Sequence, residues 1–453
     1  MSDTEALMWN LEKDPHLLAT FANVTVFDRP MDHEVFRARM ERVVRKIPRL
    51  RQRVVSSFGR LAPPEWHDEP DLDLDFHIRR VALPAPGTDT QLYDLAAALA
   101  RTPFDRARPL WEYVLVDGLS GGRGAMVQKM HHTITDGEGG VRMSIEYVDV
   151  ERHPEPPDDE GATEVTPYVP RSMVDTATDM VAHNLRRQAG LARRVVSEAV
   201  GIAGHPTRVA QLPGEALATV KSIRRQVVVS GERCSPLWTE RSLQRRFDSL
   251  RVPLADAKRA SHALGGTVND LFVTGVVGAA GAYHRDLGMP VDELRLAMPV
   301  STRQKGQSGG NHFTPTRMLV STEADPRKRF ALVQERIGAT RTERSISLTE
   351  VLAGVVNVLP SSILVSTALN QVQTVDLTCS NVRGAPFELF MAGAKILANY
   401  PIGPLGGTAC NITTLSYNGS LDMGIHMDAA AITEPKRLRE RLEDSFDELL
   451  SLG

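Results

Sequence analysis

The sequence has few cysteines and lacks the common metal and nucleotide motifs. Cys234, Cys379 and Cys410 are odd in number and widely spaced among 453 residues, which excludes a disulfide framework and a zinc spacing. We interpret them as buried thiols in a reducing cytosol. There is no H-E-x-x-H or C-x-x-C, no G-x-x-x-x-G-K-[ST] and no clear G-x-G-x-x-G after a strand, so neither a protein-bound metal nor a phosphate-binding loop is expected.

An excess of charge of either sign is also missing. The chain has 53 basic and 56 acidic residues, a net charge of −3, which argues against a protein that neutralises nucleic-acid phosphates. The first residues are acidic and lack a basic and then apolar signal pattern, so we expect a cytoplasmic location. Residues 351–375 carry no charge, but they are too polar for a spanning helix and are interrupted by Pro360. Buried helices are the expected structure there, and a surface that dips into lipid is the alternative.

Hydrophobic periodicity predicts an α/β protein. The predicted strands cover residues 21–27, 73–78, 110–115, 125–130, 294–300 and 317–321, with a hairpin of 409–417 and 421–427 around Asn418-Gly419. The predicted helices follow Asp32, cover 91–100, start near Val268 and end the chain. Residues 151–170, rich in proline and acid, suggest a linker. We therefore divide the chain into an N-terminal half (1–168), a helical connector (169–235) and a C-terminal half (236–453).

The most informative motif is His131-His132-Thr133-Ile134-Thr135-Asp136-Gly137, which follows a predicted strand. A neutral imidazole is a suitable base for a hydroxyl proton near pH 7. Neighbouring residues of a strand point to opposite faces, so only one of the two histidines can face a given cleft. We assign His132 as the base and expect His131 to shape the loop.

Asp136 and Gly137 are expected to fix the turn after the strand rather than to complete a triad. Pairing with a distant arginine would let Asp136 brace this loop, and Arg303 is the candidate. Gly306-Gln307-Ser308-Gly309-Gly310 matches the G-x-S-x-G pattern, but several polar residues separate it from the preceding strand. We interpret it as a flexible loop, so no nucleophile is expected.

Several further segments accompany this motif in a fixed order. In the N-terminal half they are Ile47 to Arg53, Asp73 to Arg80 and Arg108-Pro109-Leu110-Trp111-Glu112. In the C-terminal half they are Val268-Asn269-Asp270, Pro299-Val300-Ser301-Thr302-Arg303, Ser380-Asn381-Val382, Asn411-Ile412-Thr413 and Ser416 to Gly424. With these segments the chain resembles the bacterial wax ester synthase/diacylglycerol acyltransferase family, part of the coenzyme-A-dependent acyltransferase superfamily. Arg383 and Ala385 depart from the residues usual after Ser-Asn-Val, which bears on the choice of acceptor.

The resemblance implies two chloramphenicol-acetyltransferase-like α/β halves, with the histidines in a tunnel between them. It implies acyl transfer from acyl-CoA, as a cosubstrate with no bound cofactor, to the hydroxyl of diacylglycerol or a long-chain alcohol. The products are triacylglycerol or wax ester. The substrate-binding residues that it implies are Asn269, Asp270, Ser301, Thr302, Arg303, Ser380 and Asn381. Ser301, Thr302 and Asn381 are the candidate donors to the tetrahedral oxyanion.

Two alternatives stay open. A condensation-type or polyketide-associated acyltransferase would take its acyl group from a carrier protein, docked on the basic connector. A non-catalytic lipid-binding protein would keep the fold without turnover, although the intact His132 and Asp136 argue against it. Apolar substrates suggest a peripheral location at the inner membrane face or on lipid droplets.

Overall fold

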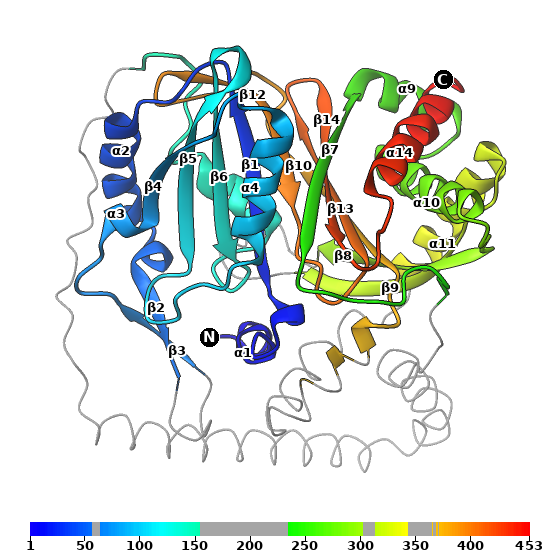
Figure 1. Ribbon diagram of the computed structural model, residues 1–453, viewed down its shortest axis with the longest axis horizontal. Helices are drawn as coiled ribbons and strands as arrows, with labels where there is room; N and C mark the ends of the chain where they lie inside the picture. Colours follow the sequence, from blue (N-terminus) through cyan, green and yellow to red (C-terminus); the bar gives the residue numbers. More distant parts are fainter. Residues whose placement is uncertain (57–63, 155–233, 302–312, 343–364, 366–367, 370) are drawn as a thin grey trace, which may run out of the picture.

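The computed structural model describes the chain except residues 57–63, 155–233, 302–312, 343–364, 366–367 and 370. Two six-stranded mixed sheets lie side by side, with helices packed on each (Figure 1). The predicted α/β class is confirmed. The predicted connector and most of the uncharged segment 351–375 lie outside the described residues.

The first sheet has the strand order β11-β12-β1-β6-β5-β4. Its strands are β1 (Thr20–Phe27), β4 (Ile78–Ala82), β5 (Trp111–Leu119), β6 (Arg123–His131), β11 (Phe390–Met391) and β12 (Ala394–Ile402). β1 is central and antiparallel to both β6 and β12, with Asn23 opposite Gln128 on one side and Pro401 on the other. A separate ribbon consists of β2 (Gln52–Val55) and β3 (Glu65–Asp68).

The second sheet has the order β7-β14-β13-β10-β8-β9. Its strands are β7 (Arg245–Pro253), β8 (Glu293–Ser301), β9 (Phe313–Ser321), β10 (Leu377–Arg383), β13 (Cys410–Tyr417) and β14 (Ser420–Asp428). β13 and β14 form the predicted hairpin, with Asn418 and Gly419 at positive φ as a tight turn requires. β10 is parallel to β8 and β13, so the sheet is mixed.

Most helices begin where the sequence provides a cap. Asp32 accepts a hydrogen bond from Val35 N–H at the start of α2, and Thr88 and Thr267 form capping boxes for α4 and α10. The longer helices are α1 (Asp3–Leu11), α2 (His33–Lys46), α4 (Asp89–Arg101), α5 (Gly137–Ser144), α9 (Leu254–Ala263), α10 (Val268–Asp286), α11 (Pro326–Thr342) and α14 (Pro435–Leu450). The short ones are η1 (Pro15–Leu17), η2 (Pro48–Arg51), α3 (Leu74–His77) and η4 (Ser120–Gly122).

Each sheet has its own core. α4 packs its apolar side on the face of the first sheet that carries Ala22, Val24 and Val26, and α2 lies on the opposite side. α9, α10, α11 and α14 cover the outer face of the second sheet (Figure 1). The face of the first sheet that carries Phe21, Asn23 and Thr25 is only partly covered, and the site develops there.

The C-terminal half contributes β11 and β12 to the first sheet. β12 follows β10 in the sequence, yet its residues from Ile396 to Ile402 pair with β1. The second sheet contacts β12 closely, because Asn399 N–H donates to the Asp422 carboxylate of β14 at 2.8 Å. The N-terminal sheet is therefore completed by the C-terminal half, which the sequence did not predict.

One predicted strand is wrong. Residues 73–78 alternate like a strand, but Leu74–His77 form a helical turn and β4 begins only at Ile78. The reason is local, since the Asp73 carboxylate accepts hydrogen bonds from the N–H groups of Asp75 and Phe76. The other predicted strands and helices are present in the described residues, with shifted ends.

Among the described residues, no single helix is long and apolar enough to cross a membrane. α9 and α10 together have the length and the apolar composition of a membrane span, but they meet at a bend of 93°.

Candidate active site

The two histidines lie at the end of β6, where backbone hydrogen bonds hold the chain on both sides. His131 N–H donates to Leu110 O at 3.0 Å, and His132 N–H donates to Ala19 O at 2.9 Å. The chain then turns through Ile134, whose N–H donates back to His131 O. Hydrogen bonds to neighbouring segments therefore fix the backbone that carries both imidazoles.

His131 is fully buried and its proton can be placed. Its Nδ1 accepts the N–H of Thr133 at 3.0 Å and lies 2.7 Å from the Thr133 hydroxyl, which can donate to it as well. A nitrogen that accepts cannot carry the proton, so the ring is the Nε2–H tautomer. Nε2 lies 2.9 Å from Oε1 of Glu12.

Glu12, at the end of α1, is the partner that the sequence did not suggest. The same Oε1 accepts Ala19 N–H at 2.8 Å, and Arg106 lies 3.8 Å from Oε2. Burial raises the pKa of Glu12, but the contacts with His131, Ala19 N–H and Arg106 outweigh it and hold the pKa below its usual value. Glu12 is thus a buried, ionised carboxylate at neutral pH. The Glu12 carboxylate thus contacts His131 directly, and Ala19, whose N–H donates to Glu12 and whose carbonyl accepts the N–H of His132, links it to the second histidine.

His132 is half-buried, and its ring faces Phe21 with the ring centroids 4.8 Å apart. Burial lowers the pKa of His132 to about 4, and the nearby Asp136 carboxylate opposes part of the shift. The imidazole is therefore neutral at physiological pH. A neutral imidazole that is still partly accessible can take a proton from a hydroxyl.

Asp136 fixes the loop that follows the histidines. Its carboxylate accepts the N–H of Gly139 at 2.7 Å and caps α5. Gly139 has no room for a side chain, because a Cβ there would lie 2.1 Å from the Thr135 hydroxyl oxygen. The expected partner Arg303 lies outside the described residues, so its pairing with Asp136 stays a prediction.

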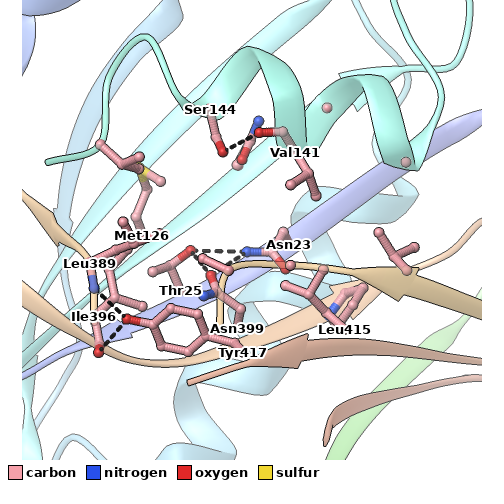
Figure 2. A pocket seen from close by; sticks show the side chains of 18 of the residues that line it. Asn23, Thr25, Met126, Val141, Ser144, Leu389, Ile396, Asn399, Leu415 and Tyr417 are labelled. Atoms are coloured by element: carbon pink, nitrogen blue, oxygen red, sulfur yellow. Dashed lines mark hydrogen bonds between the residues drawn. The ribbon is translucent and has the colours of Figure 1, made fainter. Parts of the chain in front are cut away.

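A cavity of about 810 Å³, open solvent at its mouth included, lies between the two sheets, and Phe21, which contacts His132, is part of its lining. Its floor is the partly covered face of the first sheet, with Phe21, Asn23, Thr25 and Asn399. Its other walls come from α5 and from the second sheet and its loops, where Val382, Leu415 and Tyr417 contribute (Figure 2). Gly137 and Val382 approach so closely that a Cβ on Gly137 would lie 3.3 Å from Val382 Cγ2. The His-His and Ser-Asn-Val segments therefore meet across the interface between the halves.

The remaining predicted binding residues are only partly brought together. Asn381 Nδ2 donates to Asn269 Oδ1 at 3.4 Å, so β10 and the start of α10 meet there. Ser380 is half-buried on β10, next to Asn381. The Asp270 carboxylate accepts the N–H and hydroxyl of Thr267, which assigns it to the start of α10.

The oxyanion donors are not located by these contacts. Ser301 ends β8, and Thr302 and Arg303 lie outside the described residues. Within the described part of the chain, no three His, Cys, Asp or Glu side chains are grouped to hold a metal ion.

Comparison with known proteins agrees with this geometry. A family model described as the wax ester synthase/diacylglycerol acyltransferase catalytic domain matches residues 1–272, and the C-terminal domain model of the same family matches residues 309–450. The chain belongs to the wax ester synthase/diacylglycerol acyltransferase family. It is accordingly an acyltransferase, as the resemblance predicted, and its family uses acyl-CoA.

Two relatives extend this finding to family members of similar length. A Mycobacterium tuberculosis protein named as a diacylglycerol O-acyltransferase is 32% identical over 464 residues, covering 100% of this chain and 92% of the relative. A second one from M. tuberculosis, named Tgs4, is 29% identical over 392 residues and covers 83% and 81% of the two chains.

Solved structures show the same fold. The wax ester synthase/diacylglycerol acyltransferase from Marinobacter aquaeolei VT8 has a TM-score of 0.65 at 22% identity, covering 98% of this chain and 97% of that one. The starter condensation domain of rhizomide synthetase has a TM-score of 0.59 at 15% identity, covering 100% and 93%. At these identities the likeness concerns the fold alone, and it confirms the prediction of a fold shared across the superfamily.

Proposed function

We propose that this family member transfers a long-chain acyl group from acyl-CoA to the hydroxyl of diacylglycerol or of a long-chain alcohol, with His132 as general base. The observation that carries the proposal is the neutral imidazole of His132 beside Phe21, a residue that lines the cavity. The names of the mycobacterial relatives support diacylglycerol as an acceptor.

In the proposed step, His132 accepts the proton while the acceptor oxygen attacks the thioester carbonyl. The tetrahedral intermediate collapses with release of the coenzyme A thiolate, to which the imidazolium returns the proton. No covalent acyl-enzyme is involved. The carboxylates of Glu12 and Asp136 lie near enough to favour the positive charge that His132 gains during the step.

The direct test is product formation by the purified protein. It would be incubated with labelled acyl-CoA and separately with diacylglycerol, hexadecanol and a short alcohol, and with a carrier-protein-bound acyl donor for comparison. We expect labelled triacylglycerol or wax ester from acyl-CoA. Transfer from the carrier-bound donor alone would favour the condensation-type activity, and lipid binding without turnover on any donor would favour a binding protein.

The pKa of His132 predicts the pH dependence. A base is active when unprotonated, so a pKa of about 4 leaves His132 competent throughout the range above pH 5. We expect kcat/KM to stay flat, within about twofold, from pH 5 to 8, because an acid limb at this pKa would lie below that range. An acid limb centred near the ordinary histidine value of about 6.5 would contradict a desolvated base.

Replacing Glu12 by Gln is expected to lower kcat about tenfold or more with a smaller effect on KM. The variant keeps the shape but removes the charge next to His131, and hydrogen bonds to charged groups are worth roughly 1.5–3 kcal/mol. Steady-state kinetics would measure it, with Asp14→Asn on the same segment as the control, since in the described part of the chain the Asp14 carboxylate bonds only the N–H and the ring of His16. An unchanged kcat in Glu12→Gln would show that the carboxylate has no positioning role.

The same proposal extends to location. Because both substrates are strongly apolar, we propose that the enzyme acts from the cytoplasm at a membrane or lipid-droplet surface. Flotation of the protein with phospholipid vesicles would support this location, and its exclusive recovery in the soluble fraction would oppose it.

A further inference from the structure

Four polar side chains interrupt the apolar floor of the cavity, and three of them form one hydrogen-bonded group. The fourth, Gln128 on β6, donates to the Tyr147 hydroxyl at 3.1 Å. Asn23 and Thr25 lie on β1, and Asn399 lies opposite Thr25 on β12 (Figure 2). Asn23 Nδ2 donates to Thr25 Oγ1 at 2.9 Å and to Asn399 Oδ1 at 3.1 Å, and Thr25 Oγ1 donates to the same Oδ1 at 2.9 Å. We call Asn23, Thr25 and Asn399 the polar triad.

The polar triad leaves hydrogen-bonding capacity toward the cavity. Asn399 Oδ1 accepts from both partners, but its Nδ2 donates to no group in the described residues, and the Oδ1 of Asn23 likewise accepts from none. Other polar residues of the wall differ. The Ser144 hydroxyl donates to Val141 O in its own helix, and the Tyr417 hydroxyl bonds Leu389 N–H and Ile396 O.

The chemistry of the missing partner follows from the lining. It contains no Lys, Arg, His, Asp or Glu among the described residues, so a charged phosphate or carboxylate would find no counter-charge. The Asn399 amide N–H suits a neutral acceptor such as an ester carbonyl, and the Asn23 amide oxygen suits a neutral donor such as a second hydroxyl. A plain alkyl chain in this position would leave both amide groups without partners.

The polar triad lies farther along the strand whose Phe21 contacts the reacting centre. Phe21 contacts His132, and Asn23 and Thr25 follow it on the same face of β1. With a rise of about 3.4 Å per residue, these positions lie about 7 and 14 Å along the strand from Phe21. A partial glyceride carries its ester groups within a few bonds of its free hydroxyl, whereas a fatty alcohol carries only methylenes there.

We infer that the polar triad makes this enzyme select acceptors with an ester or hydroxyl oxygen close to the reacting hydroxyl, that is partial glycerides over plain long-chain alcohols. This inference rests on the proposed function and adds the determinant of acceptor choice. β14 holds the determinant in place, because the Asp422 carboxylate accepts the N–H of Asn399. The interface between the two halves would thus position the side chains that bind the acceptor.

The test is a ratio of two activities on one enzyme. In the Asn23→Leu/Asn399→Leu variant, both amides are replaced by apolar groups of similar size. We expect the ratio of kcat/KM for diacylglycerol to that for hexadecanol to fall about 10- to 100-fold, mainly through diacylglycerol, because the unmade hydrogen bonds no longer distinguish the acceptors. Ser144→Ala is the matched control, since it removes a hydroxyl from the same cavity that is already bonded within its helix. Its ratio is expected to match wild type.

The outcomes separate the inference from the proposed function. Transfer by wild type to either acceptor supports the function, and an unchanged ratio in the variant with hexadecanol activity retained would overturn the inference alone. An equal loss on both acceptors together with a higher KM for acyl-CoA would also overturn it, by placing the triad on the donor side. No transfer by wild type to either acceptor would remove both. If the double variant does not fold by thermal melting, Thr25→Val, which deletes only the bridging hydroxyl, gives the same test with a smaller expected shift.

Discussion

Replacement of His132 by Ala is expected to lower turnover by ~10²–10⁴-fold, the usual contribution of a general base. The reason is geometric and electrostatic together. The ring lies beside Phe21, which lines the cavity, and burial keeps it unprotonated at neutral pH. No second group is available in the described site to replace it, because His131 is fully buried and its nitrogens face Thr133 and Glu12.

A second variant separates chemistry from packing. His132→Asn keeps a polar side chain against Phe21 but has no basic nitrogen, so its loss should equal that of His132→Ala. Single-turnover measurements with labelled acyl-CoA would show whether the chemical step has slowed, and thermal melting would show that both variants fold. Turnover near that of wild type in either variant would disprove the assignment of the base.

The parts of the site that the sequence predicted are those with a local signature. The strand that ends in His131-His132 and the capping aspartate all lie within a few residues of one another, so the pattern contains the geometry. Gly139 also belongs to this local unit, because its N–H donates to Asp136 and a Cβ there would lie 2.1 Å from the Thr135 hydroxyl oxygen, but it was not among the residues predicted from the sequence. A short motif of this kind can be interpreted without knowledge of the fold.

The parts that were missed depend on tertiary contacts. Glu12 lies at a helix end with no pattern around it, and only the fold brings it to His131. Asn23, Thr25 and Asn399 alternate with apolar residues, which in a sequence is typical of a solvent-exposed strand face. That face is turned toward a cavity, because α5 and the second sheet cover it.

The contribution of β12 to the first sheet had no sequence signal for a related reason. Residues 394–402 were not among the predicted strands, and alternation of side chains does not in any case say which strand is the partner. The pairing with β1 joins positions as distant as Ala22 and Ile402. The same limit explains the error at residues 73–78, where alternation was correct as a pattern and the Asp73 cap decided the structure.

Gly424 shows how strongly the position of β12 depends on the second sheet. It lies on β14 against β12, and a Cβ there would be 1.7 Å from the carbonyl oxygen of Pro401. The two nearest atoms, the carbonyl oxygen and carbon of Pro401, are backbone and cannot rotate away, and the third is Cε2 of the Phe247 ring at 2.9 Å. β12 would have to move from β14 and shift Asn399 and Pro401, which belong to the cavity floor.

Gly424→Ala is therefore expected to lower the free energy of unfolding by ~1–3 kcal/mol or more, as overpacking does, and to reduce kcat/KM for the acceptor more than for acyl-CoA. Without this clash, Gly424→Ala would be expected to raise the free energy of unfolding. Gly to Ala at a permitted backbone position stabilises a protein by about 0.4–1 kcal/mol, because it lowers the conformational entropy of the unfolded chain. Gly338→Ala in α11 is the control, because a Cβ there meets nothing within 4 Å. Thermal melting should lower the Tm of the first variant by several degrees and leave the second unchanged or higher. A Tm for Gly424→Ala at or above wild type would mean that the two sheets do not press on each other at this point, and that the cavity floor is not held by β14.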